Sequence, residues 1–164
     1  MGWMKDETGL DKRDANYRAL TPLSHLRRAA KVFPKKTALV YGDFRASYTQ
    51  YHDRCTRLAS GLAQLGVTSG DVVATLLPNI PAQAEAHFGI PACGAVLNTI
   101  NTRLDKGTIA YIFDHGEAKV ALVDTQFLPS VEAAIAEMES DGPLIIEVPD
   151  AAADYPASGR YQTY

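Results

Sequence analysis

The sequence has little of what marks several specialised protein classes. It contains two cysteines in 164 residues, which is too few for a disulfide-stabilised secreted scaffold. No apolar run approaches the roughly 18 residues that a membrane-spanning helix needs. The formal net charge is −3, and this acidity argues against a nucleic-acid-binding protein. With 46% hydrophobic and 21% charged residues, the composition is that of an ordinary globular chain.

Charge is distributed unevenly near the N-terminus. The first 14 residues carry charges of both signs, which is not the pattern of a signal peptide.

We expect Cys55 and Cys93 to be buried free thiols in a reducing compartment, and we therefore expect a cytoplasmic protein. The densest basic group follows one face of a predicted helix, where a solvated surface is a simpler interpretation than a binding patch. Its members are Arg27, Arg28, Lys31, Lys35 and Lys36.

Strand-like and helix-like patterns alternate along the chain. A turn at residues 42–43 between two short β-prone runs predicts a hairpin. Apolar runs without polar alternation then indicate parallel strands covered on both faces, at 72–77, 95–99, 119–123 and 144–148. Segments with helical periodicity separate these runs. The alternation predicts an α/β fold with an open, mainly parallel sheet, helices on both faces and right-handed crossovers.

Helix boundaries and composition suggest how the chain is divided. Thr21, Thr49 and Asp105 are placed to cap predicted helices, as is Asp124 or Thr125, and Pro91 should kink or end its helix early. Residues 1–20 form a polar N-terminal arm, and residues 21–148 form the α/β subdomain. Beyond Pro149 the composition shifts to Ala, Asp, Pro, Ser and Gly, so residues 149–164 are a linker or the start of an unfinished element.

Polar residues follow the second of the buried strands. Ligands of open α/β sheets usually bind beyond the carboxyl ends of the strands, which makes this loop a candidate site. The guanidinium of Arg103 can pair with a carboxylate or a phosphate, or it can tie the loop to a neighbouring subdomain. A structural or interface role is the preferred interpretation for the group, which comprises Asn98, Asn101, Thr102 and Arg103.

No other pattern points to catalysis. The glycine-rich motifs that hold phosphates are absent. Asp124 is a lone carboxylate at a strand end, and it suits a helix cap better than a Mg²⁺ ligand. No serine, cysteine or lysine has a visible base beside it, and the histidines lack metal-ligand spacing; they are His25, His52, His87 and His115. We therefore assign no catalytic, cofactor-binding or metal-binding residue.

Seven segments of the chain carry a family resemblance in combination. They are 48–49, 70–79, 87–91, 94–104, 109–112, 115–120 and 123–124. Taken together, these segments resemble the AMP-forming acyl-CoA synthetases. The resemblance runs from about Tyr17 to about Ile146 and is strongest to medium- and long-chain fatty acyl-CoA ligases.

The resemblance implies the large N-terminal domain of a two-step ligase. In such enzymes a carboxylate and ATP give an acyl-adenylate and pyrophosphate, with Mg²⁺ assisting, and coenzyme A then displaces AMP. It further implies a fatty acid or other carboxylate as substrate and pairing of two chains as a homodimer.

The chain departs from the family in what it lacks. The family's Ser/Thr/Gly-rich phosphate loop, its adenine-binding, ribose-binding and hinge elements, and its C-terminal lysine all follow the matched region. We therefore expect an N-terminal fragment of a longer ligase, inactive alone and binding ATP, Mg²⁺ and coenzyme A poorly, with the remainder of the ligase as its partner. The alternatives are a stand-alone α/β binding module, or an interaction domain whose partner supplies the missing half.

Overall fold

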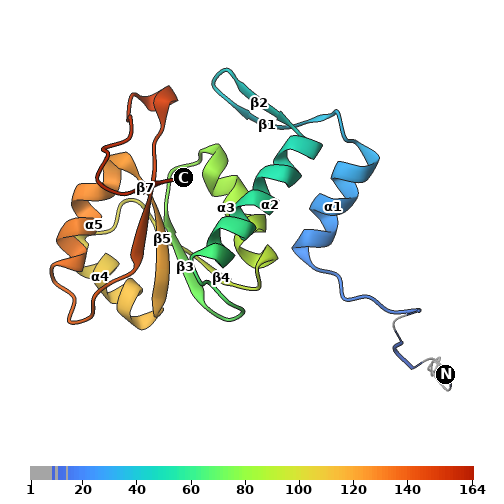
Figure 1. Cartoon of the computed structure of the whole chain (residues 1–164), viewed down its shortest axis with the longest axis horizontal. Coiled ribbons are helices and arrows are strands. Elements are labelled where there is room, and N and C mark those ends of the chain that lie inside the picture. The colour runs from blue at the N-terminus through green and yellow to red at the C-terminus, as the bar shows by residue number, and fades with distance from the viewer. Residues whose placement is uncertain (1–8, 10, 14) are drawn as a thin grey trace, which may run out of the picture.

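The computed structural model of the chain describes residue 9, residues 11–13 and residues 15–164 (Figure 1). Helices and strands alternate along this part of the chain as the sequence predicts. The elements are α1 Pro22–Val32, β1 Thr37–Tyr41, β2 Phe44–Ser47, α2 Tyr48–Gln64, β3 Val72–Leu76, α3 Pro81–Ala92, β4 Val96–Thr99, α4 Lys106–His115, β5 Ala118–Asp124, the 3-10 helix η1 Thr125–Phe127, α5 Leu128–Ile135, β6 Leu144–Val148, the 3-10 helix η2 Ala151–Ala153 and β7 Gln162–Thr163.

The four apolar runs form one parallel sheet, which confirms the predicted fold class. Its strand order is β4-β3-β5-β6-β7, and each neighbouring pair runs parallel. The predicted hairpin is also present, with β1 and β2 pairing as a separate antiparallel sheet.

Helices cover both faces of the parallel sheet. Figure 1 shows α2 and α3 on one side and α4 and α5 on the other. Successive strand residues point to opposite faces, so each central strand needs apolar side chains throughout. In β3, for example, Val73 packs in the core that contains α2 and α3, whereas Ala74 packs in the core that contains α4 and α5. Both residues are fully buried.

The helix caps differ from the prediction most clearly at the start of α2. Thr21 occupies the N-cap of α1 as predicted, but its side chain makes no capping hydrogen bond. Thr49 was expected to cap α2, but the helix begins at Tyr48 and its N-cap is Ser47. The Ser47 hydroxyl accepts a hydrogen bond from the Gln50 amide at 3.3 Å, and the Gln50 side chain accepts one from the Ser47 amide at 2.8 Å. This reciprocal pair satisfies two backbone donors, which a cap at Thr49 would leave open. Asp105 caps α4 as predicted.

Proline and cysteine positions agree with most of the expectations. Pro91 lies in the last turn of α3, which ends one residue later at Ala92. Both cysteines are free thiols. Cys55 is buried in a small cluster with Leu26 of α1, whereas Cys93 is only partly buried.

The segment after β6 contains a strand for which composition gave no signal. After η2 the chain turns back, and β7 pairs in parallel with β6 through the register Ile146 with Gln162 and Glu147 with Thr163. β7 is therefore an edge strand of the parallel sheet.

A close approach of two helices depends on one glycine. A Cβ atom at Gly89 of α3 would lie 2.7 Å from the Leu58 side chain and 3.0 Å from the Cys55 carbonyl oxygen, both in α2. Gly61 of α2 provides a matched contrast, because a Cβ there would have no neighbour within 4 Å.

We predict opposite effects of alanine at these two helical glycines. Gly61→Ala should raise the free energy of unfolding by roughly 0.5–1 kcal/mol, because alanine favours the helix. Gly89→Ala should lower it by about 1–3 kcal/mol, because overpacking between α2 and α3 outweighs that gain. Urea denaturation of both variants measures the difference. Stabilisation of similar size in both would contradict the close contact.

Candidate functional site

The carboxyl ends of the parallel strands gather at one edge of the sheet, where ligands of such folds usually bind. The β1–β2 hairpin is tied to this edge, because the Tyr41 hydroxyl donates to the Asp150 carboxylate at 2.5 Å. Figure 1 shows the hairpin and η2 at the same end of the molecule. That hydrogen bond, followed by burial, raises the pKa of Tyr41 to about 12.

Asp124 is the buried acid at the carboxyl end of β5. It is fully buried, and its Oδ1 caps η1 by accepting a hydrogen bond from the Gln126 amide at 2.9 Å. Its Oδ2 has no hydrogen-bond partner among the residues that the structure describes. Burial raises the pKa of Asp124, and the nearby Asp150 charge raises it further. Asp124 is a cap as predicted, but of the 3-10 helix η1 rather than of α5, whose N-cap is Phe127. The unpaired oxygen is the kind of feature that clusters at functional sites.

A cavity of about 240 Å³ lies between the hairpin and the start of α3. The Oε1 atom of Gln83 is buried and has no partner among the described residues. The backbone carbonyl of the same residue contacts Nδ1 of His87 at 2.8 Å. The lining residues come from β1, the β3–α3 loop and α3; they are Leu39, Val40, Tyr41, Asn79, Ile80, Pro81, Gln83, Ala84 and His87.

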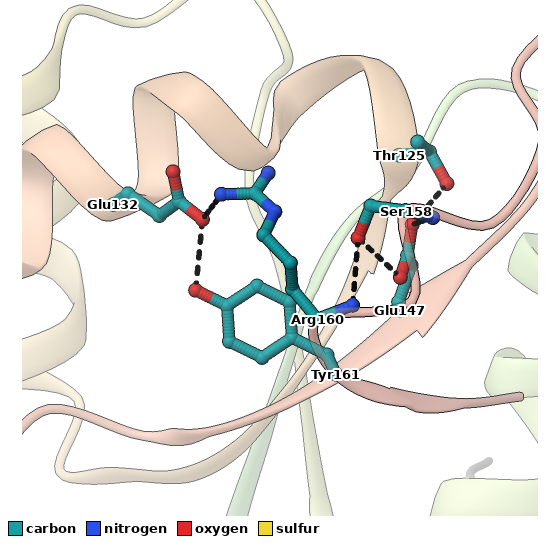
Figure 2. A network of polar contacts seen from close by, with 6 residues as sticks. All are labelled: Thr125, Glu132, Glu147, Ser158, Arg160 and Tyr161. Carbon is teal, nitrogen blue, oxygen red and sulfur yellow. Dashed lines mark hydrogen bonds and ion pairs between the residues drawn. The ribbon is translucent and has the colours of Figure 1, made fainter.

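A second buried acid, Glu147 of β6, collects donors from distant parts of the chain (Figure 2). Its carboxylate accepts hydrogen bonds from the Thr125 hydroxyl at 2.8 Å, the Ser158 amide at 2.7 Å and the Ser158 hydroxyl at 2.8 Å. Burial alone raises the pKa of Glu147, but these hydrogen bonds outweigh it and hold the pKa below its ordinary value. The side chain is therefore charged, although it is fully buried.

Glu132 of α5 extends the same network toward the surface. It accepts hydrogen bonds from the Arg160 guanidinium at 2.5 Å and the Tyr161 hydroxyl at 2.9 Å, as Figure 2 shows. The Arg160 hydrogen bond, followed by that of Tyr161, lowers the pKa of Glu132.

A further buried acid, Glu85 of α3, binds the side chain of Tyr164. Glu85 is fully buried and forms a two-pronged pair with the guanidinium of Arg54. It also accepts a hydrogen bond from the Tyr164 hydroxyl at 2.5 Å. Burial and the Glu85 charge raise the pKa of Tyr164. A cavity of about 300 Å³ opens beside this group, between α2 and β7.

The polar loop predicted as a site follows β4, the edge strand at the other end of the sheet from β7. Asn98 belongs to β4, and its amide lies against Gly116, the C-cap of α4. In the loop, the Asn101 side chain accepts a hydrogen bond from the Arg103 amide at 3.0 Å. Thr102 is partly buried and the Arg103 side chain is exposed. The loop lies at the carboxyl edge of the sheet, with β3 between its strand and the strand that carries Asp124. Its role stays a prediction.

Asp150 follows a predicted strand end, where site residues are expected, whereas the buried acids Glu85 and Glu147 were not predicted from the sequence. One signal was available for these two. Glu85 and Glu147 each interrupt a run of apolar or small residues that fold as a buried helix face and a buried strand. An acid in such a position is costly unless it is paired, so it predicts partners elsewhere in the chain.

The residues present do not fit a metal–triphosphate site. No group of three or more His, Cys, Asp or Glu within the described part of the chain is placed to hold a metal ion. The buried charged residues are carboxylates, whose negative charge disfavours binding of a triphosphate.

None of the helices in the described ranges is long and apolar enough to span a membrane.

A family model described as "AMP-binding enzyme" matches residues 26–162. The chain is 43% identical over 152 residues to the peroxisomal acetate/butyrate–CoA ligase AAE7 of Arabidopsis thaliana, covering 89% of this chain and 27% of that protein. It is 48% identical over 126 residues to the peroxisomal trans-cinnamate:CoA ligase of Petunia hybrida, covering 77% and 22%. The chain spans about a quarter of the length of these curated relatives.

Comparison with solved structures agrees with these sequence similarities. A Mycobacterium tuberculosis fatty acyl CoA synthetase superposes with a TM-score of 0.72 at 31% identity, covering 82% of this chain and 29% of that one. The parallel sheet with its two helical layers therefore matches an N-terminal portion of ligases with known structures.

We predict unequal costs for removing the charge of two carboxylates in the C-terminal network. Glu147→Gln should lower the free energy of unfolding by about 1–3 kcal/mol, because its amide group faces buried donors and leaves them unpaired. Glu132→Gln should cost less than about 1 kcal/mol, because the Glu132 side chain is 33% exposed and water can replace the lost pairing. Chemical denaturation at neutral pH compares the two. Equal losses would show that Glu147 has no special role.

Proposed function

Because the chain belongs to the AMP-binding enzyme family, we propose that it forms the N-terminal part of an ATP-dependent ligase that joins a carboxylic acid to coenzyme A. The observation that carries this proposal is the family match over residues 26–162. Relatives named as acetate/butyrate and trans-cinnamate CoA ligases support it.

The proposed reaction has two steps. A carboxylate oxygen of the acid attacks the α-phosphorus of ATP, and the bond to pyrophosphate breaks, which leaves an acyl-adenylate. The sulfur of coenzyme A then attacks the acyl carbon, and AMP departs with the electron pair of the broken bond. Chemistry of this kind depends on positioned donors and cations around the phosphates.

These 164 residues supply the scaffold of such an enzyme rather than its phosphate-binding groups. The sequence has no glycine-rich phosphate loop. The fully buried charges of the described residues are acids, which belong to hydrogen-bond networks inside the domain. We therefore propose that ATP, Mg²⁺ and coenzyme A bind to groups outside this chain and that the chain alone is inactive.

The proposed substrate is a carboxylic acid, which is a broader class than the fatty acids that the sequence resemblance implied. The relatives' names include short-chain, aromatic and fatty acids. A carboxylic acid is the common feature, and a medium- or long-chain fatty acid remains the narrower proposal. Its test is a comparison of acids of different chain length with the intact gene product.

Location and assembly also remain proposals. The sequence favours the cytoplasm, and the relatives named as peroxisomal make the peroxisome the alternative compartment. Imaging of the tagged native protein distinguishes the two.

Self-association as a homodimer is supported by exposed apolar side chains at the β4 edge and on α4, including Val96 at 52% and Tyr111 at 63% exposure. Sedimentation of the purified chain measures it.

The proposal predicts a clear division of activity. The intact native gene product that contains these residues should exchange pyrophosphate into ATP in the presence of at least one acid from a panel running from acetate to long-chain acids and cinnamate. The purified 164-residue chain should give no exchange above background, because even one lost oxyanion-type donor costs on the order of 3 kcal/mol, or about a hundredfold in rate.

Two outcomes would count against this proposal. Exchange by the 164-residue chain alone would show that its active site lies within these residues. A native gene product no longer than this chain and without exchange would favour a stand-alone binding module.

A further inference from the structure

Positive charge is concentrated in one segment near the N-terminus. Residues 15–42 contain no aspartate or glutamate, although the whole chain has 19 of these acids and a net charge of −3. The same segment contains six of the 16 lysines and arginines, which are Arg18, Arg27, Arg28, Lys31, Lys35 and Lys36. A local excess of this size in an acidic protein indicates an anionic partner.

The fold presents this charge on an outer surface. α1 lies at the periphery, with α2 between it and the sheet (Figure 1). Its inner face is fixed by Leu26, which is buried against Tyr51 and Cys55 of α2. The helical spacing of Arg27, Arg28 and Lys31 places them together on the outer side, and Lys35 and Lys36 follow in the turn before β1.

These five basic residues are exposed. Within the described residues none of them forms an ion pair. Lys36 lies over the ring of Phe33 at 5.6 Å, which leaves its charge unneutralised. The helix dipole accounts for one cation in the last turn, Lys31, but not for the other four.

Apolar side chains stand among these cations. Val32 is 55% exposed and Phe33 is 54% exposed, and both lie at the C-terminal end of α1 between Lys31 and Lys35. These two side chains give the surface an apolar component beside its positive charge. We refer to Arg27, Arg28, Lys31, Val32, Phe33, Lys35 and Lys36 as the basic surface.

The shape of the basic surface narrows the kind of partner. It consists of a helix end and the following turn, and none of its residues lines either of the two cavities described above. A projecting surface with cations around exposed apolar groups suits a soft, planar, negatively charged interface. Anionic lipid headgroups attract clustered lysine and arginine, while apolar side chains enter the headgroup layer.

We propose that the basic surface binds the surface of anionic lipid membranes. In this arrangement Val32 and Phe33 enter the interfacial layer, and the lysines and arginines meet the lipid phosphates and carboxylates. The proposal is independent of the ligase chemistry, because it uses no residue of the carboxyl edge. It is an alternative to the expectation that this helix face is merely solvated.

The test is co-sedimentation of the 164-residue chain with vesicles at 0.1 M salt. Vesicles of phosphatidylcholine alone are compared with vesicles containing 30% phosphatidylserine. Lys31→Glu combined with Lys35→Glu removes charge from the basic surface, and Val32→Ser combined with Phe33→Ser removes its apolar part. The matched control, Arg57→Glu with Lys106→Glu, makes the same change in net charge at exposed positions elsewhere.

We expect the chain to bind phosphatidylserine vesicles at least tenfold more strongly than phosphatidylcholine vesicles, and to release them at 1 M salt. The lysine variant should lose at least tenfold in binding and the apolar variant at least threefold. The control should stay within twofold of the native chain. Thermal unfolding of each variant confirms that it is folded.

Three results would overturn the proposal. Equal binding to both vesicle types would remove the role of headgroup charge. An equal loss in the control variant would show that only net charge matters. Displacement of the chain from vesicles by stoichiometric poly-glutamate or duplex DNA would identify an acidic protein or nucleic acid as the preferred partner.

Discussion

A carboxylate that is buried and charged must be surrounded by hydrogen-bond donors, and this requirement organises the C-terminal part of the structure. Glu147 takes three hydrogen bonds from Thr125 and Ser158, and Glu85 takes its hydrogen bonds from Arg54 and Tyr164. Two of these donor residues belong to the last seven residues of the chain. The segment that carries β7 is therefore held to the sheet by these acids, together with the backbone pairing of β7 with β6 and the packing of Tyr161 against the core.

This arrangement has a consequence for the proposed function. Because β7 runs parallel to β6, Tyr164 lies at the same carboxyl edge as Asp124 and Asp150. Under the proposed function, the hydrogen bonds to Glu85 and Glu147 hold Ser158 and Tyr164 at this edge of the sheet, which is consistent with the scaffold role that we propose for the chain.

The sequence was most informative where burial alone determines structure. The apolar runs that became β3, β4, β5 and β6 predicted the parallel sheet, because strands covered on both faces need apolar residues at every position. β7 could not be predicted in this way. It has two residues, both exposed, and exists because the Tyr164 amide and side chain find acceptors on Glu147 and Glu85.

Sequence patterns were also insufficient to predict how the candidate site is assembled. Sequence reasoning selected Asn101 and Arg103 because they are polar residues after an apolar strand, and it identified Asp124 as a cap. It could not show that Asp150 lies close to Asp124, or that Tyr41 reaches Asp150 across 109 positions of the chain. Such pairs depend on strand order, which local patterns do not encode. The basic residues of α1 were visible in the sequence, but their exposure beside Val32 and Phe33 was not.

Amide hydrogen exchange at Ser158 and Tyr164, followed as a function of pH, tests most directly whether the charged Glu147 holds the C-terminal segment. The pKa of Glu147 is lowered in the folded state, so its stabilisation is complete above the unfolded value of about 4.3 and is lost as pH falls through the folded pKa. Both amides should be protected at neutral pH and lose protection in that acidic window, before Val73 of the sheet core does. Unprotected amides at neutral pH, or protection that survives protonation of Glu147, would contradict the account.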